Sequence, residues 1–289
     1  MTGSKKRSIR RSRSRKQRSN MFKNFFNKIF VISLYDQVKK FEKVEKQFKN
    51  RGIKVDRFIA IDGRCKKEGD KACKDKLNSF EIRYDVTISN KKKLPLKELI
   101  PASSLTIGTI LLLRKMVKEK WDYILICEDD IELTRGFELK FKQGIKEIGN
   151  YKWDILYLGC GGECGLRGIS EDYSSKNKFK SEVGDIYDWE FYLNNKNDLR
   201  FPCEDSCEIF SEHISIPNAA GGTWCYAYSL AGAKKILKLI DDDAGNHIDQ
   251  ILKSNMGAGN PIKALAFDPP IVYHEHIIQR EGSTIPWSW

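Results

Sequence analysis

Apolar residues follow two patterns along this chain: short uninterrupted runs, and stripes at helical spacing. The first unit spans residues 28 to 61. Its two runs, Lys28–Leu34 and Val55–Ile61, predict strands buried on both faces. Between them, Gln37–Asn50 predicts a helix with one apolar stripe. The stripe consists of Val38, Phe41, Val44 and Phe48. This βαβ unit has the size of a mononucleotide-binding half.

The alternation continues through the middle of the chain. A helix is predicted over about Leu105–Lys120, and an apolar run from Trp121 to Cys127 predicts the next strand. Apolar residues at helical spacing between Phe137 and Ile148 predict a further helix, and Asp154–Leu158 predicts a further strand. Alternating strands and helices indicate an α/β fold: one Rossmann-like domain whose mostly parallel sheet has helices on both faces.

Two segments interrupt this pattern. Residues 64–100 are rich in lysine and poorly periodic, and we expect them to leave the core. Residues 160–220 hold twelve acids against six Lys/Arg, and they predict a long insertion at the strand ends. Regular structure is predicted to resume with a strand at Trp224–Tyr228, a helix at Ala231–Ile240 and a last strand within Ile271–His274.

The net charge of +12 is concentrated at the N-terminus. Residues 1–20 carry nine Lys/Arg and no acid, so the remaining chain has a net charge of only +3. A Ser/Arg-rich tail with so few apolar residues cannot offset its ordering entropy, and we expect it to be disordered. The predicted organisation is therefore a basic tail at 1–20 and one domain at 21–289, which carries the insertion at about 160–220.

The tail has two possible roles. It could bind an anionic partner such as nucleic acid or membrane phosphates, or act as a nuclear or virion address; alternatively, it only aids solubility. The following stretch, Phe22–Leu34, is interrupted by Lys23, Asn24, Asn27 and Lys28, and its apolar part is far shorter than the ~20 residues that span a bilayer. No other stretch qualifies as a membrane span or signal, so we expect a cytoplasmic protein.

The strand that begins after Trp121 ends in three consecutive carboxylates, Glu128, Asp129 and Asp130. Ligands of open α/β sheets bind at the carboxyl ends of strands. Three acids there repel one another unless a cation offsets their charge, and oxygen ligands suit Mg²⁺ or Mn²⁺, which also bind phosphates. The alternative is that these acids only solvate the strand end or cap the next helix.

Eight cysteines allow several kinds of chemistry. Cys127 and Cys225 lie within apolar runs and are predicted to be buried thiols. The pairs Cys160/Cys164 and Cys203/Cys207 share one spacing. They could form a four-thiolate zinc site, disulfides, or ordinary thiols.

Several segments together resemble glycosyltransferase family 25, which includes lipooligosaccharide and procollagen galactosyltransferases. The resemblance extends from about Ile29 to Gln279. The matching segments are Phe30–Leu34, Phe58–Gly63, Ile124–Asp130, Trp153–Gly159, Gly221–Ser229, Gly232–Leu237 and Ile248–Asp249. The family usually has a Gly-Glu-Ile-Gly-Cys segment followed by Ser-His before the acidic strand. Here Leu105–Leu113 lacks that Glu and the Ser-His pair, and Lys39-Lys40 stands where an arginine pair is common.

The resemblance implies a GT-A fold and an inverting, metal-dependent enzyme that transfers a hexose, galactose or glucose, from a UDP-sugar to a hydroxyl of a glycan or of hydroxylysine. It implies that Mn²⁺ or Mg²⁺ is held by acids of the triplet and a late histidine. The implied ligands are Glu128, Asp130, His274 and His276. The implied donor contacts are Ser33, Asp62, Gly63, Asp129, Gly221 and Gly222. The implied general base is Asp249.

Structural or different functional roles remain open. Asp249 could instead cap a helix over Gln250–Asn255, Asp62-Gly63 could be a plain turn, and a late histidine could be structural. The domain could be a degenerate scaffold beside a nucleic-acid-binding tail, but it is nearly neutral and lacks a basic aromatic face. A metal-dependent nucleotidyl- or phosphotransferase would need a phosphate-binding Gly/Lys loop, which the sequence lacks.

Overall fold

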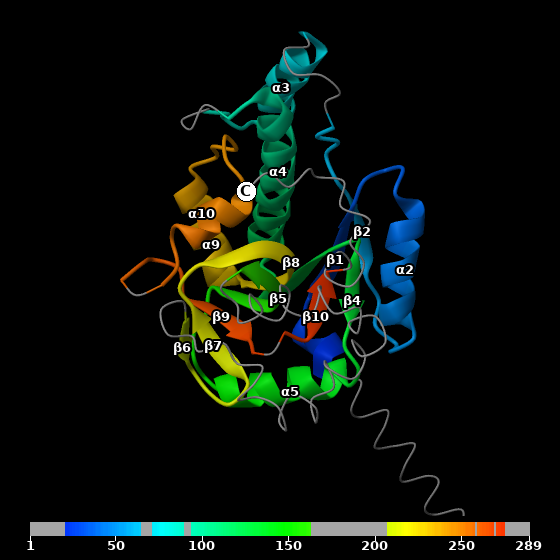
Figure 1. Ribbon diagram of the computed structural model, residues 1–289, viewed down its shortest axis with the longest axis vertical. Coiled ribbons are helices and arrows are strands. Elements are labelled where there is room, and N and C mark those ends of the chain that lie inside the picture. The colour runs from blue at the N-terminus through cyan, green and yellow to red at the C-terminus, as the bar shows by residue number, and fades with distance from the viewer. Residues whose placement is uncertain are drawn as a thin grey trace, which may run out of the picture.

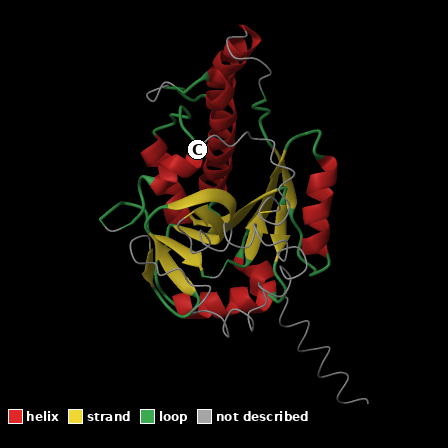
Figure 2. Cartoon of the chain, viewed as in Figure 1, coloured by secondary structure: helices red, strands yellow, loops and turns green. Residues whose placement is uncertain are grey.

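The computed structural model describes residues 21–64, 71–89, 94–162, 207–257, 259–268 and 270–274. A central sheet with helices on both faces dominates this part of the chain (Figures 1 and 2). The basic tail at 1–20 and most of the insertion predicted at about 160–220 lie outside the described residues.

The main sheet has eight strands in the order β2-β1-β3-β8-β5-β9-β7-β6. The strands are β1 (Lys28–Ser33), β2 (Asp56–Ile59), β3 (Tyr123–Glu128), β5 (Ile155–Gly162), β6 (Cys207–Ile209), β7 (Ile214–Pro217), β8 (Ala220–Ser229) and β9 (Ala264–Phe267). The short strands β6, β7 and β9 were not predicted from the sequence.

Strand direction shows that this is a mixed sheet. β1 pairs in parallel with β2 and β3, and β5 pairs in parallel with β9. The central strand β8 is antiparallel to both of its neighbours, β3 and β5. The predicted α/β fold class is confirmed, and the arrangement agrees with a Rossmann-like glycosyltransferase fold. The apolar run of β8 predicted a buried strand but contained no information on its direction.

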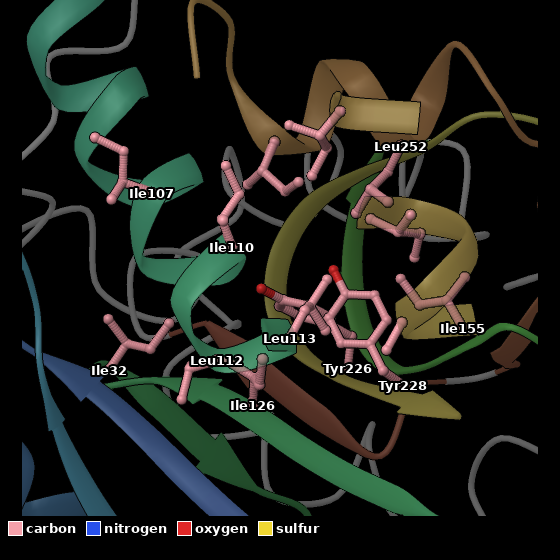
Figure 3. Close-up of a cluster of buried hydrophobic side chains, with 14 of the residues drawn as sticks. Ile32, Ile107, Ile110, Leu112, Leu113, Ile126, Ile155, Tyr226, Tyr228 and Leu252 are labelled. Atoms are coloured by element: carbon pink, nitrogen blue, oxygen red, sulfur yellow. The ribbon is translucent and has the colours of Figure 1, made fainter. Parts of the chain in front are cut away.

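The sheet separates two apolar layers. One contains α2 (Val38–Lys49) and α5 (Phe137–Ile148); the other contains α3 (Lys71–Tyr84), α4 (Leu96–Glu119), α9 (Leu230–Ile240) and α10 (Ile248–Lys253). β3 contributes Leu125 and Cys127 to the first layer, and Ile124 and Ile126 to the second. Figure 3 shows the second layer between α4 and the sheet. Burial on both faces explains why β3 is continuously apolar.

α4 is the longest helix of the core. It begins at Leu96, nine residues before the predicted start, and includes Pro101 near its N-terminus. By length and composition α4 could cross a membrane, contrary to the expectation that no stretch qualifies, but 67% of its most apolar window is buried inside the fold. We therefore describe it as a core helix. α3 lies in the segment that was expected to be irregular; only Cys73 and Phe80 of this helix are buried, which explains its weak periodicity.

The aromatic stretch before β1 belongs to the core. Residues 21–25 are helical, and the Phe22 ring is fully buried with its centroid 4.7 Å from Phe137 and 4.6 Å from Phe141. The next predicted helix, α2, is confirmed, but its stripe is narrower than expected. Val44 and Phe48 are buried, whereas Val38 is 43% exposed because it occupies the first helical position.

A separate two-stranded ribbon packs against the main sheet. β4 (Ile131–Leu133) pairs antiparallel with β10 (Val272–His274), with Ile131 opposite His274. The ribbon passes close to β5: a Cβ at Gly159 would lie 2.1 Å from the Val272 carbonyl oxygen. Only a glycine at position 159 leaves room for the backbone of β10. The last predicted strand is therefore present, but it belongs to a ribbon whose other strand the sequence did not reveal.

The described cysteines differ in state. Cys127 and Cys225 are free, buried thiols, as predicted. Cys73 and Cys160 each take part in a disulfide, so Cys160 does not offer a thiolate to the zinc site that was considered. Cys164 and Cys203 lie outside the described residues, and so does the side chain of Cys207.

Candidate active site

The carboxyl end of β3 brings two acids and one histidine together. Glu128 is the last residue of β3, Asp130 precedes β4, and His274 ends β10. His274 Nε2 lies 2.9 Å from Asp130 Oδ1 and 3.4 Å from Glu128 Oε2. One ligand atom from each residue lies within 4.8 Å of the other two. Three of the four predicted metal ligands thus meet at one point; the fourth, His276, lies outside the described residues.

The acids of this cluster are partly removed from water. Burial raises the pKa of Glu128, and the charge of nearby Asp130 adds to this effect. Burial also raises the pKa of Asp129. For His274, burial lowers the pKa, but hydrogen bonds to Asp130 and Glu128 outweigh burial and raise it to about 9. The imidazolium offsets the charge of the carboxylates here, as a cation would.

The oxygen and nitrogen atoms of this cluster are suitable ligands for a divalent cation. Carboxylate oxygens suit Mg²⁺ and Mn²⁺, and an imidazole nitrogen shifts the preference toward a transition metal such as Mn²⁺. Ligand atoms that each lie about 2.0–2.1 Å from one ion are at most about 4 Å apart, and the three ligand atoms of the cluster already lie within 4.8 Å of one another. The imidazole must give up its proton when it binds a metal. Glu128, Asp130 and His274 would hold the ion.

Three residues not predicted from the sequence complete the surroundings. The Thr223 hydroxyl donates to Glu128 Oε1 at 3.3 Å, and the Lys40 ammonium lies 3.6 Å from Asp130 Oδ2. The Trp224 ring packs against the His274 ring with centroids 5.6 Å apart. Thr223 and Trp224 carry no sequence pattern that marks them as site residues, and Lys40 was noted only as part of the Lys39-Lys40 pair, without a role at the site.

The predicted donor contacts lie around this cluster in different ways. Ser33 ends β1 and comes directly after Ile32, which pairs with Glu128, so Ser33 and Asp129 lie at the same end of neighbouring strands. Gly221 and Gly222 lie in β8 just before Thr223, and Gly222 has a φ of +67°, which favours glycine. Ser33 and Asp129 therefore lie beside the candidate metal site, and the two glycines precede Thr223, which bonds to Glu128.

Asp62 and Gly63 lie in the loop that follows β2. Both oxygens of Asp62 accept hydrogen bonds from Arg64, and this pairing lowers the pKa of Asp62 to about 2. Gly63 packs against α4, where an added Cβ would lie 2.7 Å from Pro101 Cα. This close approach explains why position 63 is a glycine. A role of Asp62 or Gly63 in binding the sugar donor stays a prediction.

Asp249 lies in the first turn of α10. The N-cap of this helix is His247, so the alternative that Asp249 is itself the N-cap is wrong; its Oδ1 accepts from the next backbone N–H, of Gln250, at 2.8 Å. The turn before α10 is tied to α4, because the Thr106 hydroxyl donates to the Asn246 carbonyl oxygen at 2.7 Å.

Two buried tyrosines lie near Asp249 and near the cluster of Glu128, Asp130 and His274. Burial raises the pKa of Tyr157, and the charge of Asp249 contributes to this shift. Tyr226 on β8 lies opposite Tyr157 on β5, with ring centroids 6.1 Å apart, and the charge of Glu128 contributes to the raised pKa of Tyr226. Tyr157 is thus influenced by the charge of Asp249 and Tyr226 by that of Glu128, and both rings are buried in the second apolar layer.

A second group with metal-ligand chemistry lies between α5 and the β6–β7 hairpin. Glu147 Oε1 lies 2.5 Å from His213 Nδ1, and Glu212 is nearby. Glu147 also accepts hydrogen bonds from Gln143 and Ser211. These bonds lower the pKa of Glu147, against the opposing effect of burial. The many bonds to one carboxylate indicate a structural link between the helix and the hairpin.

Comparison with known proteins identifies a family. Residues 26–252 match the model of glycosyltransferase family 25 (LPS biosynthesis protein). The match covers β1 to α10 and includes the acidic end of β3. A search of the curated proteins finds no match.

Proposed function

The chain belongs to glycosyltransferase family 25, and from this premise we propose that it transfers a hexose from a UDP-sugar to an acceptor hydroxyl in a metal-dependent, inverting reaction. The observation that carries this proposal is the meeting of Glu128, Asp130 and His274 at the carboxyl end of β3. The family resemblance supports galactose or glucose as the sugar, and a glycan or a hydroxylysine of a collagen-like protein as the acceptor.

Each group has a distinct task in this reaction. A bound Mn²⁺ or Mg²⁺ would offset the charge that develops on the leaving diphosphate. Glu128, Asp130 and His274 would hold that ion. Thr223 keeps the Glu128 carboxylate in place through its hydrogen bond, and Lys40 adds a positive charge beside Asp130.

The acceptor side is assigned to Asp249. An inverting transfer needs one base, which removes the proton of the acceptor hydroxyl as the new bond to the anomeric carbon forms. Asp249 lies in the first turn of α10, and α10 packs against β8, the strand that carries Thr223 beside Glu128.

A donor panel tests the proposal. The full chain is incubated with Mn²⁺ and UDP-galactose, UDP-glucose or a GDP-sugar, with and without a simple hydroxyl acceptor, and released nucleotide is measured. We expect release from a UDP-sugar only when Mn²⁺ is present, and faster release with the acceptor. Release that is equally fast after chelation of Mn²⁺, or no release from any UDP-sugar, would refute the proposal.

A further inference from the structure

The loop that follows β1, residues 34–37, is fixed on one side by Arg57 of β2. The Arg57 guanidinium donates from Nη2 to the carbonyl oxygen of Leu34 at 2.7 Å and to that of Tyr35 at 3.2 Å. The guanidinium itself is held over the Phe41 ring, 5.3 Å from its centroid. A planar cation that is stacked on a ring and bonded to two successive carbonyls restricts the backbone of this loop.

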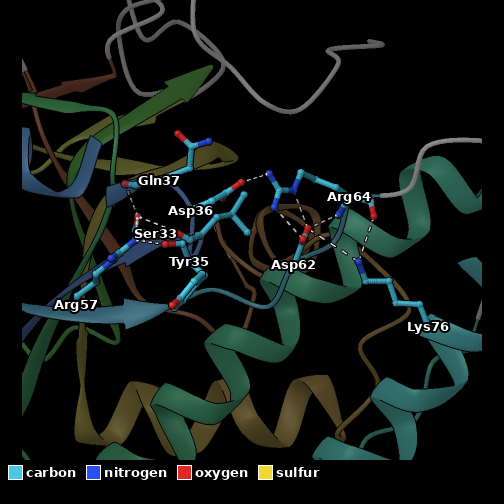
Figure 4. A network of polar contacts seen from close by, with 9 residues as sticks. Ser33, Tyr35, Asp36, Gln37, Arg57, Asp62, Arg64 and Lys76 are labelled. Atoms are coloured by element: carbon cyan, nitrogen blue, oxygen red, sulfur yellow. Dashed lines mark hydrogen bonds and ion pairs between the residues drawn. The ribbon is translucent and has the colours of Figure 1, made fainter. Parts of the chain in front are cut away.

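The same loop is fixed on its other side by Arg64 (Figure 4). Arg64 Nη1 lies 2.6 Å from Asp36 Oδ2, and the rest of this guanidinium binds both oxygens of Asp62. Lys76 of α3 donates to the Arg64 carbonyl oxygen at 3.1 Å. The loops after β1 and β2 are therefore joined by one arginine, and α3 supports the junction.

Tyr35 lies between these two anchors, and its side chain is 81% exposed. Its backbone is held while its ring faces solvent, so a flat ligand could cover the ring at little cost in backbone entropy. Tyr35 also lies beside the acidic edge of the sheet. It follows Ser33 by two residues, Ser33 comes directly after Ile32, which pairs with Glu128, and β1 is the direct neighbour of β3 at the usual strand spacing of about 4.8 Å.

We propose that the Tyr35 ring is the stacking platform for the base of a nucleoside diphosphate whose phosphates lie at the Glu128–Asp130 edge. This inference rests on the proposed function. A nucleoside diphosphate is long enough for its base to reach the neighbouring strand end while its phosphates lie at the metal cluster. Stacking requires only the flat face that every base has, so Tyr35 contributes affinity rather than the choice of base.

The test compares a ligand that has a base with one that lacks it. Binding of UDP and of inorganic pyrophosphate to the full chain is measured by calorimetry in Mn²⁺. The proteins are wild type, Tyr35→Ala, Tyr35→Phe and a matched control, Ile209→Ala, which removes a side chain of similar exposure (66%) at the far edge of the sheet. We expect Tyr35→Ala to weaken UDP binding about 5- to 150-fold, the range that base–aromatic stacking supplies, and to leave pyrophosphate binding unchanged. Tyr35→Phe and Ile209→Ala should bind both ligands as the wild type does.

The outcomes separate this inference from the proposed function. Wild-type protein that binds pyrophosphate but gains nothing from the uridine of UDP would overturn the inference and contradict the uridine donor. Wild-type protein that prefers UDP, together with unchanged UDP affinity in Tyr35→Ala, would overturn the inference alone. Equal weakening of UDP and pyrophosphate in Tyr35→Ala would also overturn it, because the base would then not be the group that Tyr35 contacts.

Discussion

His274 Nε2 lies 2.9 Å from Asp130 Oδ1, although nearly half of the chain separates the two residues. The β4–β10 ribbon produces this contact, because it places His274 opposite Ile131, the residue that follows Asp130. The same ribbon depends on Gly159, which leaves space for the backbone of β10. The antiparallel pairing of β4 with β10 thus adds the His274 imidazole to a site that the sequence shows only as a group of carboxylates.

The hydrogen bond from Thr223 to Glu128 should tune metal affinity. Thr223→Val keeps the side-chain volume but removes the hydroxyl that donates to Glu128 Oε1. Groups that orient metal ligands are typically worth 10- to 100-fold in metal affinity, so we expect Mn²⁺ binding to weaken by about tenfold with little change in stability. Calorimetric titration with Mn²⁺ measures the first effect, and thermal unfolding measures the second.

Thr134→Val is the matched control for this prediction. Thr134 is also buried, but within the described residues its hydroxyl has no hydrogen-bond partner. Its replacement should leave Mn²⁺ affinity unchanged and stability unchanged or higher, because a buried hydroxyl without a partner costs free energy. Equal Mn²⁺ affinity in both variants would show that Thr223 does not orient Glu128.

Asp249→Asn separates a catalytic role from a structural one. Asparagine keeps the size of the side chain and an oxygen that can accept from Gln250 N–H, but it cannot take a proton. General-base catalysis is typically worth about 10²–10⁴ in rate. We expect kcat to fall by that factor while the affinity for UDP and the melting temperature stay at wild-type values. Normal transfer by this variant would remove Asp249 from the mechanism.

Two helix glycines should respond oppositely to alanine. At Gly232 of α9, a Cβ would lie 2.1 Å from the Asp154 carbonyl oxygen, and the backbone there must shift. Overpacking of this kind costs about 1–3 kcal/mol of unfolding free energy. At Gly108 of α4, the Cβ would meet only a Phe58 ring carbon at 3.5 Å, an ordinary contact, so alanine should stabilise the helix by about 0.5–1 kcal/mol.

Urea unfolding of the two glycine variants tests this contrast. If Gly232→Ala is as stable as the wild type, α9 does not pack as closely against the Asp154 backbone as described.

The Asp62–Arg64 pair should give the protein an acid-dependent contribution to stability. Arg64 lowers the folded-state pKa of Asp62 to about 2, below its ordinary value of 3.8. The contribution is therefore complete above about pH 4 and is lost as the pH falls toward 2. Because the Asp62 side chain is 47% exposed, it amounts to less than about 1 kcal/mol.

Unfolding free energies of wild type and Asp62→Asn between pH 5 and pH 2 provide the measurement. The difference between the two proteins should shrink as the pH falls. A difference that stays constant over this range would contradict the assigned pKa.

Sequence patterns revealed the parts of this fold that depend on burial. Continuous apolar runs identified β1, β3 and the core of β8, because these strands lie between two helical layers. They did not reveal that β8 runs antiparallel, since burial is the same in either direction. β4 has only three residues, and α3 buries only Cys73 and Phe80, so neither has enough apolar positions to form a pattern.

The candidate site was predictable where its chemistry is concentrated in the sequence. Three adjacent acids after an apolar run marked the candidate metal site, and the low number of histidines drew attention to His274. Thr223 and Tyr35 could not be found in this way. Their importance follows from what the fold brings beside them: the carboxylate of Glu128 in one case, and two arginine anchors in the other.

Mn²⁺ binding by Asp130→Asn tests the central claim most directly. Calorimetry on the full chain should show Mn²⁺ binding in the wild type, and loss of at least tenfold in affinity in both Asp130→Asn and His274→Ala. Glu132→Gln is the matched control: Glu132 lies two residues from Asp130, and its carboxylate pairs with Lys43 at 2.6 Å. It should bind Mn²⁺ as the wild type does. Wild-type Mn²⁺ affinity in Asp130→Asn would contradict the assignment of the metal site.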